Sequence, residues 1–248
     1  DLLNLSLEAD CFDYIALATD RLIEQSLPEG IVLSLDRPGK KFQFGERLYE
    51  LLQQSECEQF VYIGAGSAPL ISADDLIILK EKINSEQLIC ITNNYFSADF
   101  FALNSSDVFT QLSQYPSTDN EVPRALKEEL NVYIEELPRN TITQFNIDSP
   151  LDLVTLNCAA AGGPLLRRSI AKWDNDSNFL SDAAKMLNDS SKQIFVSGRV
   201  GSYTWQYLER QTACRVRMLS EERGMGAAGA DGSLRATSSL AQVIESVG

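Results

Sequence analysis

The chain has 248 residues, of which 44% are hydrophobic, enough for one large domain or for one domain with a small second unit. Its formal net charge of −14 argues against wrapping nucleic acid or an anionic membrane, and no run reaches the roughly 18 apolar residues of a membrane-spanning helix. Histidine is absent, which excludes Ser-His-Asp and Cys-His catalysis and leaves hard, oxygen-bound ions such as Mg²⁺ as the expected metals.

The cellular context follows from the first residues and from the cysteines. The start, DLLNLSLEAD, lacks the basic and apolar parts of a signal peptide. The five cysteines are spaced singly, without a CxxC pair. Both features predict a cytoplasmic protein with reduced thiols.

Strand and helix patterns alternate along the first part of the chain. The predicted strands are 12–19, 30–35, 59–64, 87–92, 99–103, 132–137 and 143–147, and the helices between them include 44–55, 73–83, 122–130 and 149–160. This alternation predicts a three-layer, doubly wound α/β fold with a mostly parallel sheet and helices on both faces. AGGP, at 161–164, reads as a linker, which predicts domains at 1–160 and 165–248, the second a small α/β unit.

Small residues follow the predicted strand that ends at Gly64. The segment reads GAGSAPL, and Ser72 then starts a helix with Asp74 and Asp75 in its first turn. Such a turn lets a backbone approach a ligand closely at the end of a strand. The candidate contacts are Gly64, Gly66, Ser67 and Pro69; a tight turn without a ligand is the alternative.

A polar segment, TNNYFSAD, follows the next predicted strand. The side chains of Asn93, Asn94, Ser97 and Asp99 can read a base or a sugar by hydrogen bonds, and Asp99 can also contact a metal. The alternative is an Asn-rich turn with no ligand.

Asp148 stands at a predicted strand end, immediately before a helix that starts with Ser149 and Pro150. A carboxylate there is placed to share Mg²⁺ with a triphosphate, or to cap the helix, and the two roles are compatible. In RPGKKFQFG, Lys40 and Lys41 can contact phosphates, or they lie in a solvated loop.

Three segments, VYIGAGSAPLISADDL, ITNNYFSADFFAL and FNIDSPLDLVTL, together resemble MobA-like nucleotidyltransferases in order and spacing, over roughly residues 10 to 158. The resemblance implies a GT-A type, nucleotide-diphospho-sugar transferase-like fold. It implies Mg²⁺-dependent transfer of a nucleotidyl group from a nucleoside triphosphate to a small phosphorylated acceptor. Asp148 matches an acidic position of the family and would be the catalytic metal ligand.

Two elements of that family are not matched. AGSA replaces the metal aspartate that follows the glycine at Gly64, and the glycine-rich loop LxGGxGxRxG has no counterpart, so this loop is either lost or precedes Asp1. The second hypothesis is therefore a catalytically degenerate nucleotide- or metabolite-binding module. The sequence leaves the nucleotide, the acceptor and the oligomeric state open, and is compatible with a homo-oligomer.

The second unit is rich in arginine. Five arginines and no lysine lie between 199 and 223: Arg199, Arg210, Arg215, Arg217 and Arg223. In SGRVGS a strand gives way to a helix, so Arg199, Gly201 and Ser202 are candidates to bind a phosphate, a carboxylate or an acidic partner. Pairing of the arginines with acids of the same unit is the alternative, and Trp205 is expected in the core.

Overall fold

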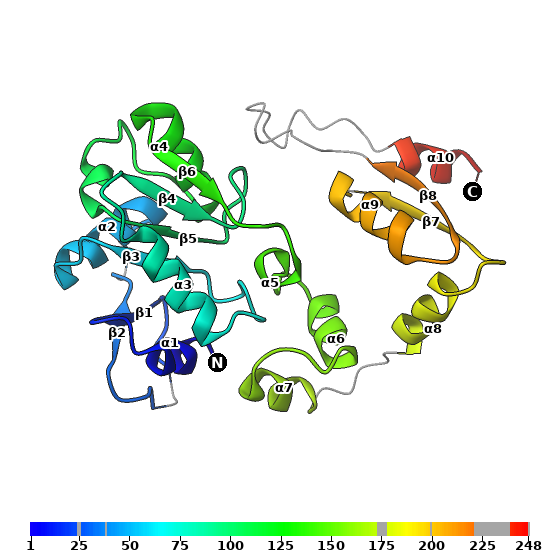
Figure 1. Cartoon of the computed structure of the whole chain (residues 1–248), viewed down its shortest axis with the longest axis horizontal. Coiled ribbons are helices and arrows are strands. Elements are labelled where there is room, and N and C mark those ends of the chain that lie inside the picture. The colour runs from blue at the N-terminus through cyan, green and yellow to red at the C-terminus, as the bar shows by residue number, and fades with distance from the viewer. Residues whose placement is uncertain (24–25, 38, 173–177, 199, 221–238, 248) are drawn as a thin grey trace. The chain divides into compact units, whose positions relative to one another are not determined.

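The computed structural model describes residues 1–23, 26–37, 39–172, 178–198, 200–220 and 239–247 (Figure 1). The chain is mixed α/β, as the alternating pattern predicted. It divides into two compact units, Asp1–Trp173 and Asp174–Gly248. The AGGP segment lies between two helices of the first unit, where Gly162 turns the chain with a φ of 91°.

The elements of the first unit follow the alternation closely. In chain order they are α1 (Leu2–Ala9), β1 (Ile15–Thr19), β2 (Ile31–Leu35), α2 (Phe44–Ser55), β3 (Phe60–Ile63), α3 (Ala73–Ile83), β4 (Ile89–Thr92), β5 (Phe100–Leu103), η1 (Ser106–Thr110), η2 (Asp119–Glu121), α4 (Val122–Leu130), β6 (Tyr133–Glu136), α5 (Thr141–Gln144), α6 (Pro150–Cys158) and α7 (Pro164–Ile170).

The strands described in this unit form two sheets. β1 and β2 make a parallel pair in which Ile15 lies beside Ile31 and Thr19 beside Leu35. The other sheet has the order β3-β5-β4-β6. In it, β5 runs antiparallel to β3 and to β4, whereas β6 is parallel to β4.

This sheet differs from the mostly parallel one that the alternation predicted. β5 starts at Phe100, soon after β4 ends at Thr92, and a connection this short cannot cross the sheet to begin a parallel strand. The predicted strand 143–147 is also absent as such. Its first residues belong to the short helix α5, capped by the Asn140 side chain, and Asn146 forms an isolated bridge.

Helices cover both faces of the four-stranded sheet. One buried cluster joins α2, η1 and α4 to the side chains of Phe101 and Leu103, and a second joins α1 and α3 to those of Phe100 and Ala102. Side chains alternate along β5 in this way because successive residues of a strand point to opposite faces. The apolar runs of the central strands are thereby buried on both sides.

Helix starts are set by local sequence. Ser72 and Asp75 form a capping box at α3, in which each side chain binds the backbone N–H of the other residue. Pro123 and Pro150 occupy the first turns of α4 and α6, where the N–H that proline lacks would have no helical partner. These helices then fix the chain direction on either side of the site.

The second unit is smaller. It contains α8 (Asn178–Leu187), β7 (Gln193–Gly198), α9 (Ser202–Gln211), β8 (Arg215–Ser220) and α10 (Ser239–Val247), with β7 and β8 parallel. Among its described residues, Cys214 alone is buried. Trp205 is 38% exposed, so its predicted place in the core is wrong: a two-stranded sheet is too narrow to enclose an indole.

None of the described helices in either unit is long and apolar enough to cross a membrane.

Candidate functional site at the carboxyl end of strand β3

The turn from Gly64 to Pro69 follows β3 and is fixed by close backbone contacts. The Gly64 N–H donates to the Asp99 carbonyl oxygen at 3.1 Å, and the Ser67 N–H donates to the Gly64 carbonyl oxygen at 2.9 Å. A Cβ atom on Gly64 would lie 2.8 Å from Ser67 Oγ and 3.2 Å from the Asp99 carbonyl oxygen. A side chain at the head of this turn would force the Ser67 hydroxyl and the Asp99 carbonyl group to shift.

A second segment, Asn146–Ile147, lies against this turn. Ser67 and Asn146 form an antiparallel bridge, and the Ile147 N–H donates to the Gly66 carbonyl oxygen at 2.8 Å. A Cβ on Gly66 would come within 2.8 Å of the Ile147 carbonyl oxygen. Gly66 therefore permits the contact that brings the next residue, Asp148, to the turn.

The Asn93 side chain joins three segments around the site and is 1% exposed. Its Nδ2 donates to Asp99 Oδ2 at 3.0 Å and to the Thr143 carbonyl oxygen at 3.1 Å. Its Oδ1 accepts from the N–H groups of Asp99 and Phe100 at 3.0 and 3.4 Å. Because both ends of the amide are engaged, Asn93 holds the end of β4, the start of β5 and α5 together.

Asn94, Ser97 and Asp99 of the TNNYFSAD segment are more open to solvent than Asn93. Asn94 Oδ1 accepts from the Phe96 N–H at 3.1 Å, which is the local turn that asparagine favours. The Ser97 hydroxyl donates to Asn120 Oδ1 at 3.0 Å, and the Phe96 side chain is 61% exposed. The segment is thus an Asn-rich turn that also presents polar and aromatic groups beside Asp99.

Sequence reasoning missed Tyr62 and Asp119. The Tyr62 hydroxyl donates to Asp119 Oδ2 at 3.0 Å. Burial, followed by the negative charges of Asp119 and Asp99, raises the pKa of this hydroxyl well above its ordinary value. A Cβ on Gly64 would lie 3.6 Å from the hydroxyl oxygen, so Tyr62 reaches the same turn. The available signal was a tyrosine hydroxyl near the end of an otherwise apolar strand.

Asp148 is exposed, and its carboxylate has no hydrogen-bond partner among the residues described. The helix cap that was one of its two expected roles belongs instead to Asp152. The Asp152 Oδ2 atom accepts from the Asp148 N–H at 3.0 Å, from the Ser149 N–H at 2.7 Å and from the Ser149 hydroxyl at 2.8 Å. The Asp148 carboxylate is left available to bind a ligand.

Asn146 carries a buried Oδ1 atom that accepts no hydrogen bond from the described part of the chain. Residues opposite each other on an antiparallel pair project to the same side, so this amide lies on the side of the Ser67 hydroxyl. An unpaired buried acceptor costs roughly 1–3 kcal/mol. A donor from a ligand or from water would remove this cost.

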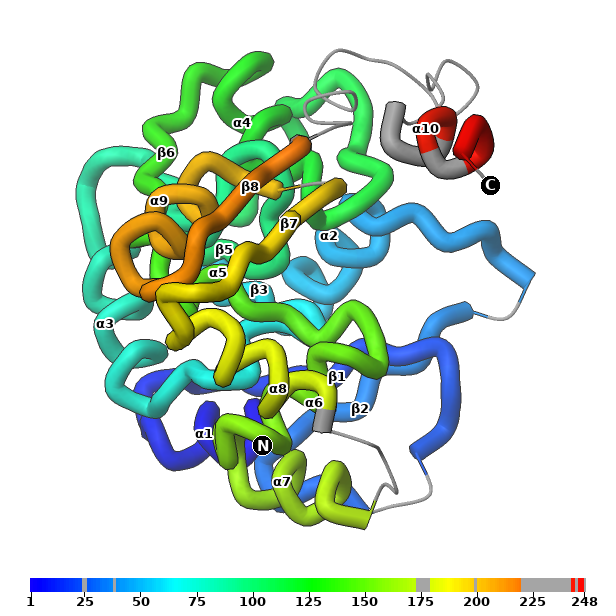
Figure 2. Tube along the Cα trace, turned by 90° about the vertical axis from the view of Figure 1, so that its right-hand side faces the viewer, coloured from blue at the N-terminus to red at the C-terminus, as the bar shows by residue number. Residues whose placement is uncertain are grey.

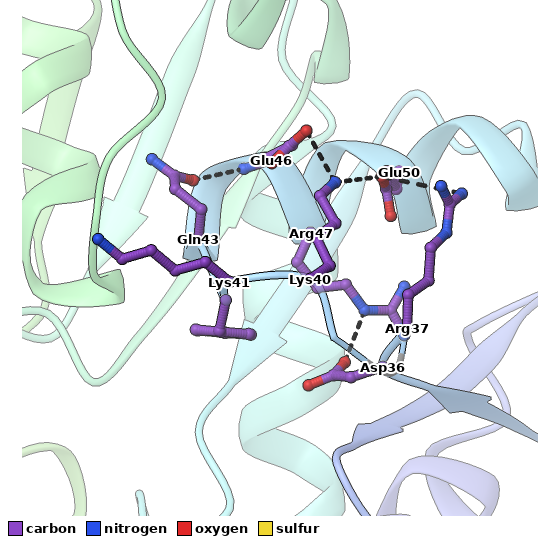
Figure 3. Close-up of a pocket in the computed structure, with 9 residues that line it drawn as sticks. Asp36, Arg37, Lys40, Lys41, Gln43, Glu46, Arg47 and Glu50 are labelled. Carbon is purple, nitrogen blue, oxygen red and sulfur yellow. Dashed lines mark hydrogen bonds and ion pairs between the residues drawn. The ribbon is translucent and has the colours of Figure 1, made fainter.

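The lysines of RPGKKFQFG border a different pocket, at the start of α2 (Figure 3). Lys40 Nζ lies 2.8 Å from a Glu46 carboxylate oxygen and 3.0 Å from one of Glu50, and these two bonds raise its pKa. Arg47 pairs with Asp36 at 2.8 Å. Lys41 points away from this network (Figure 3). The charges of this pocket are therefore largely balanced from within.

The candidate anion site of the second unit is only partly described. Gly201 precedes α9 and Ser202 begins it, whereas Arg199 and Arg223 lie outside the described residues. Arg210, Arg215 and Arg217 form no ion pair with the acids that the structure describes.

Several predicted residues of the first unit thus gather around one turn. Gly66 and Ser67 contact the segment before Asp148, and Gly64 binds Asp99, which the Asn93 side chain holds on the other side. No three acidic or cysteine side chains of the described ranges come together as a metal-binding group. Comparison with models of known protein families finds no match, and comparison with curated protein sequences finds no similar protein.

Proposed function

We propose that the first unit is a nucleotidyltransferase-like domain of the MobA-like kind, with a GT-A type, doubly wound fold, which binds a nucleoside triphosphate at the carboxyl end of β3. The observation that carries the proposal is the contact of Asn146–Ile147 with the turn at Gly66, because it brings the free carboxylate of Asp148 to a small-residue turn. Ligands of open α/β sheets bind at this end of the strands.

The residues take roles that suit nucleotidyl transfer. Asp148 would hold Mg²⁺, with Asp99 as a second contact, and the ion would neutralise charge on the phosphate oxygens. The turn at Gly64 and Gly66 would lie along the phosphates, and the Ser67 hydroxyl would donate a hydrogen bond to one of their oxygens. A phosphate oxygen of the small acceptor would attack the α-phosphorus, and pyrophosphate would leave. A phosphate nucleophile needs no general base, which suits a chain without histidine.

A binding module without catalysis is the second candidate. Its support is the turn itself, in which Ala65 to Ala68 supply no acid, and the pairing of Lys40 with Glu46 and Glu50. In this case the same site would bind a nucleotide or metabolite, and the arginine-rich second unit would bind an anion or an acidic partner.

The test is a thermal-unfolding screen with GTP, CTP, ATP and UTP, each with and without Mg²⁺, followed by assay of pyrophosphate release. A bound nucleotide at a hundredfold excess over Kd stabilises the protein by about 2.7 kcal/mol. We expect one nucleotide to raise the unfolding midpoint in a Mg²⁺-dependent manner, and Asp148→Asn to remove that dependence.

Asp107→Asn is the matched control. Asp107 is an exposed acid of η1, which follows β5 at the opposite end of the sheet, where the Ser106 N–H binds the Glu58 carbonyl oxygen. The substitution removes the same charge away from the site and should leave the shift unchanged. A shift without pyrophosphate release would favour the binding module, and no shift with any nucleotide would refute the nucleotidyltransferase.

A further inference from the structure

Both sheets of the first unit end in strands that have no further partner among the described residues. β3 is the end strand of the four-stranded sheet, and the β1–β2 pair belongs to no larger sheet among the described residues. Figures 1 and 2 both place the β1–β2 pair beyond β3, on the side of β3 that faces away from β5. The open edge of β3 therefore faces the region of this second, separate sheet.

β3 has the character of a central strand. Phe60 and Tyr62 pack in the cluster under α2, and Val61 and Ile63 pack in the cluster under α1 and α3. The strand carries no charge and no proline. Exposed sheet edges are normally protected by charged side chains, proline or bulges.

β6, the end strand on the other side of the same sheet, shows the contrast. It contains Glu135 and Glu136, and its Tyr133 side chain is 48% exposed. β6 is protected as an open edge is expected to be, and β3 is not.

The open edge of β3 consists of the backbone groups of Val61 and Ile63. The Gly64 N–H donates to the carbonyl oxygen of Asp99, the residue immediately before β5. Every second residue of an antiparallel strand directs both of its backbone groups to the same neighbouring strand. Tyr62 therefore faces β5 as Gly64 does. Val61 and Ile63 direct their N–H and carbonyl groups away from it.

The start of α1 lies at the carboxyl end of β3. The Asp1 carboxylate accepts from the N–H groups of Leu165 and Leu166 at 3.0 and 2.7 Å. In the turn before these residues, a Cβ on Gly162 would be 3.9 Å from the carbonyl oxygen of Pro69, which ends the turn after β3. α1 itself packs on α3, over the sheet face that holds Val61 and Ile63.

We infer that a further β-strand pairs with the open edge of β3, on the side of the β1–β2 pair, and that polypeptide preceding Asp1 supplies it. A strand leading into α1 and then to β1 forms a βαβ unit, in which the two strands are parallel and normally belong to one sheet. It would join the two sheets into one, and its connection to α1 would pass the turn at Gly64. The inference of this strand depends on the unprotected edge of β3 and does not require that the protein bind a nucleotide.

Hydrogen exchange, measured amide by amide on the complete translated protein, tests the inference. The Val61 and Ile63 amides are expected to exchange as slowly as the Tyr62 amide, which β5 already protects. Rapid exchange at Val61 and Ile63 beside slow exchange at Tyr62 would refute the strand. Protection that rises with protein concentration would also overturn the inference, because a second copy would then supply the strand.

Proline substitution gives an independent readout. Val61→Pro removes the outward N–H, so compared with Val61→Ala it should lower the unfolding midpoint by about 5 °C or more. Ile134 supplies the control: the Leu137 N–H binds the Thr92 carbonyl oxygen on β4, so Ile134 directs its own N–H away from β4, to the open edge of β6. Ile134→Pro should differ little from Ile134→Ala. Equal effects at the two positions would contradict the proposed strand.

Discussion

Gly66→Ala tests whether the contact between the turn and Asn146–Ile147 holds the site together. The new Cβ would lie 2.8 Å from the Ile147 carbonyl oxygen, which is backbone and cannot swing aside as a side chain can. Overpacking of this kind costs about 1–3 kcal/mol. Separation of the two segments would also weaken the 2.8 Å bond from the Ile147 N–H to the Gly66 carbonyl oxygen, worth about 1 kcal/mol.

Urea unfolding should therefore show a loss of about 2–4 kcal/mol in the free energy of unfolding for Gly66→Ala. Ala65→Ser, at the exposed neighbouring position, is the control and should change the free energy of unfolding by less than about 0.5 kcal/mol. If Gly66→Ala is as stable as the Ala65→Ser variant, the close approach of the two segments is not a structural requirement. Nucleotide binding by the same variants shows whether Asp148 depends on this contact.

Two further substitutions test the side chains around the turn. Asn93→Ala leaves its partners on Asp99 and Thr143 unpaired and should lower the free energy of unfolding in urea by about 3 kcal/mol. Asn94→Ala, at a more exposed position, should lower it by less than about 1 kcal/mol. Equal losses would contradict the role of Asn93 in holding β4, β5 and α5 together. The raised pKa of the Tyr62 hydroxyl means that the folded state holds this proton more tightly than the unfolded state does. The stabilisation of the fold by this protonated hydroxyl is therefore complete below about pH 10 and is lost progressively as the pH rises further. Stability measured from pH 8 to 11 should thus fall less in Tyr62→Phe than in the wild type; identical slopes would refute this reasoning.

Much of the local structure was predictable because short-range chemistry fixes it. The apolar spacing of Leu48 and Leu52 and the glutamine cap at Gln43 place α2, and Ser72 with Asp75 starts α3. Apolar runs identified β3 and β4, and the turn at Gly64 was recognised from its small residues. These features depend on neighbours within a few residues.

The direction of β5 and the roles of single side chains depend on distant neighbours. Asn93 was expected to face an acceptor, and the fold engages its amide with Asp99 and Thr143 instead. Asp148 was expected either to cap α6 or to bind metal, and Asp152 took the cap. Sequence spacing does not show which of two nearby carboxylates will turn back to the helix.

The sequence by itself determined the α/β class, most of the element positions and the segments from which a site would be built, because periodicity, capping and turn chemistry are local. Only the tertiary structure decided that Gly66 meets Ile147, that Tyr62 reaches the turn, and that β3 keeps an open apolar edge beside a separate strand pair. Those outcomes depend on which segments pack together across the sheet, and long-range packing leaves no local pattern in the chain.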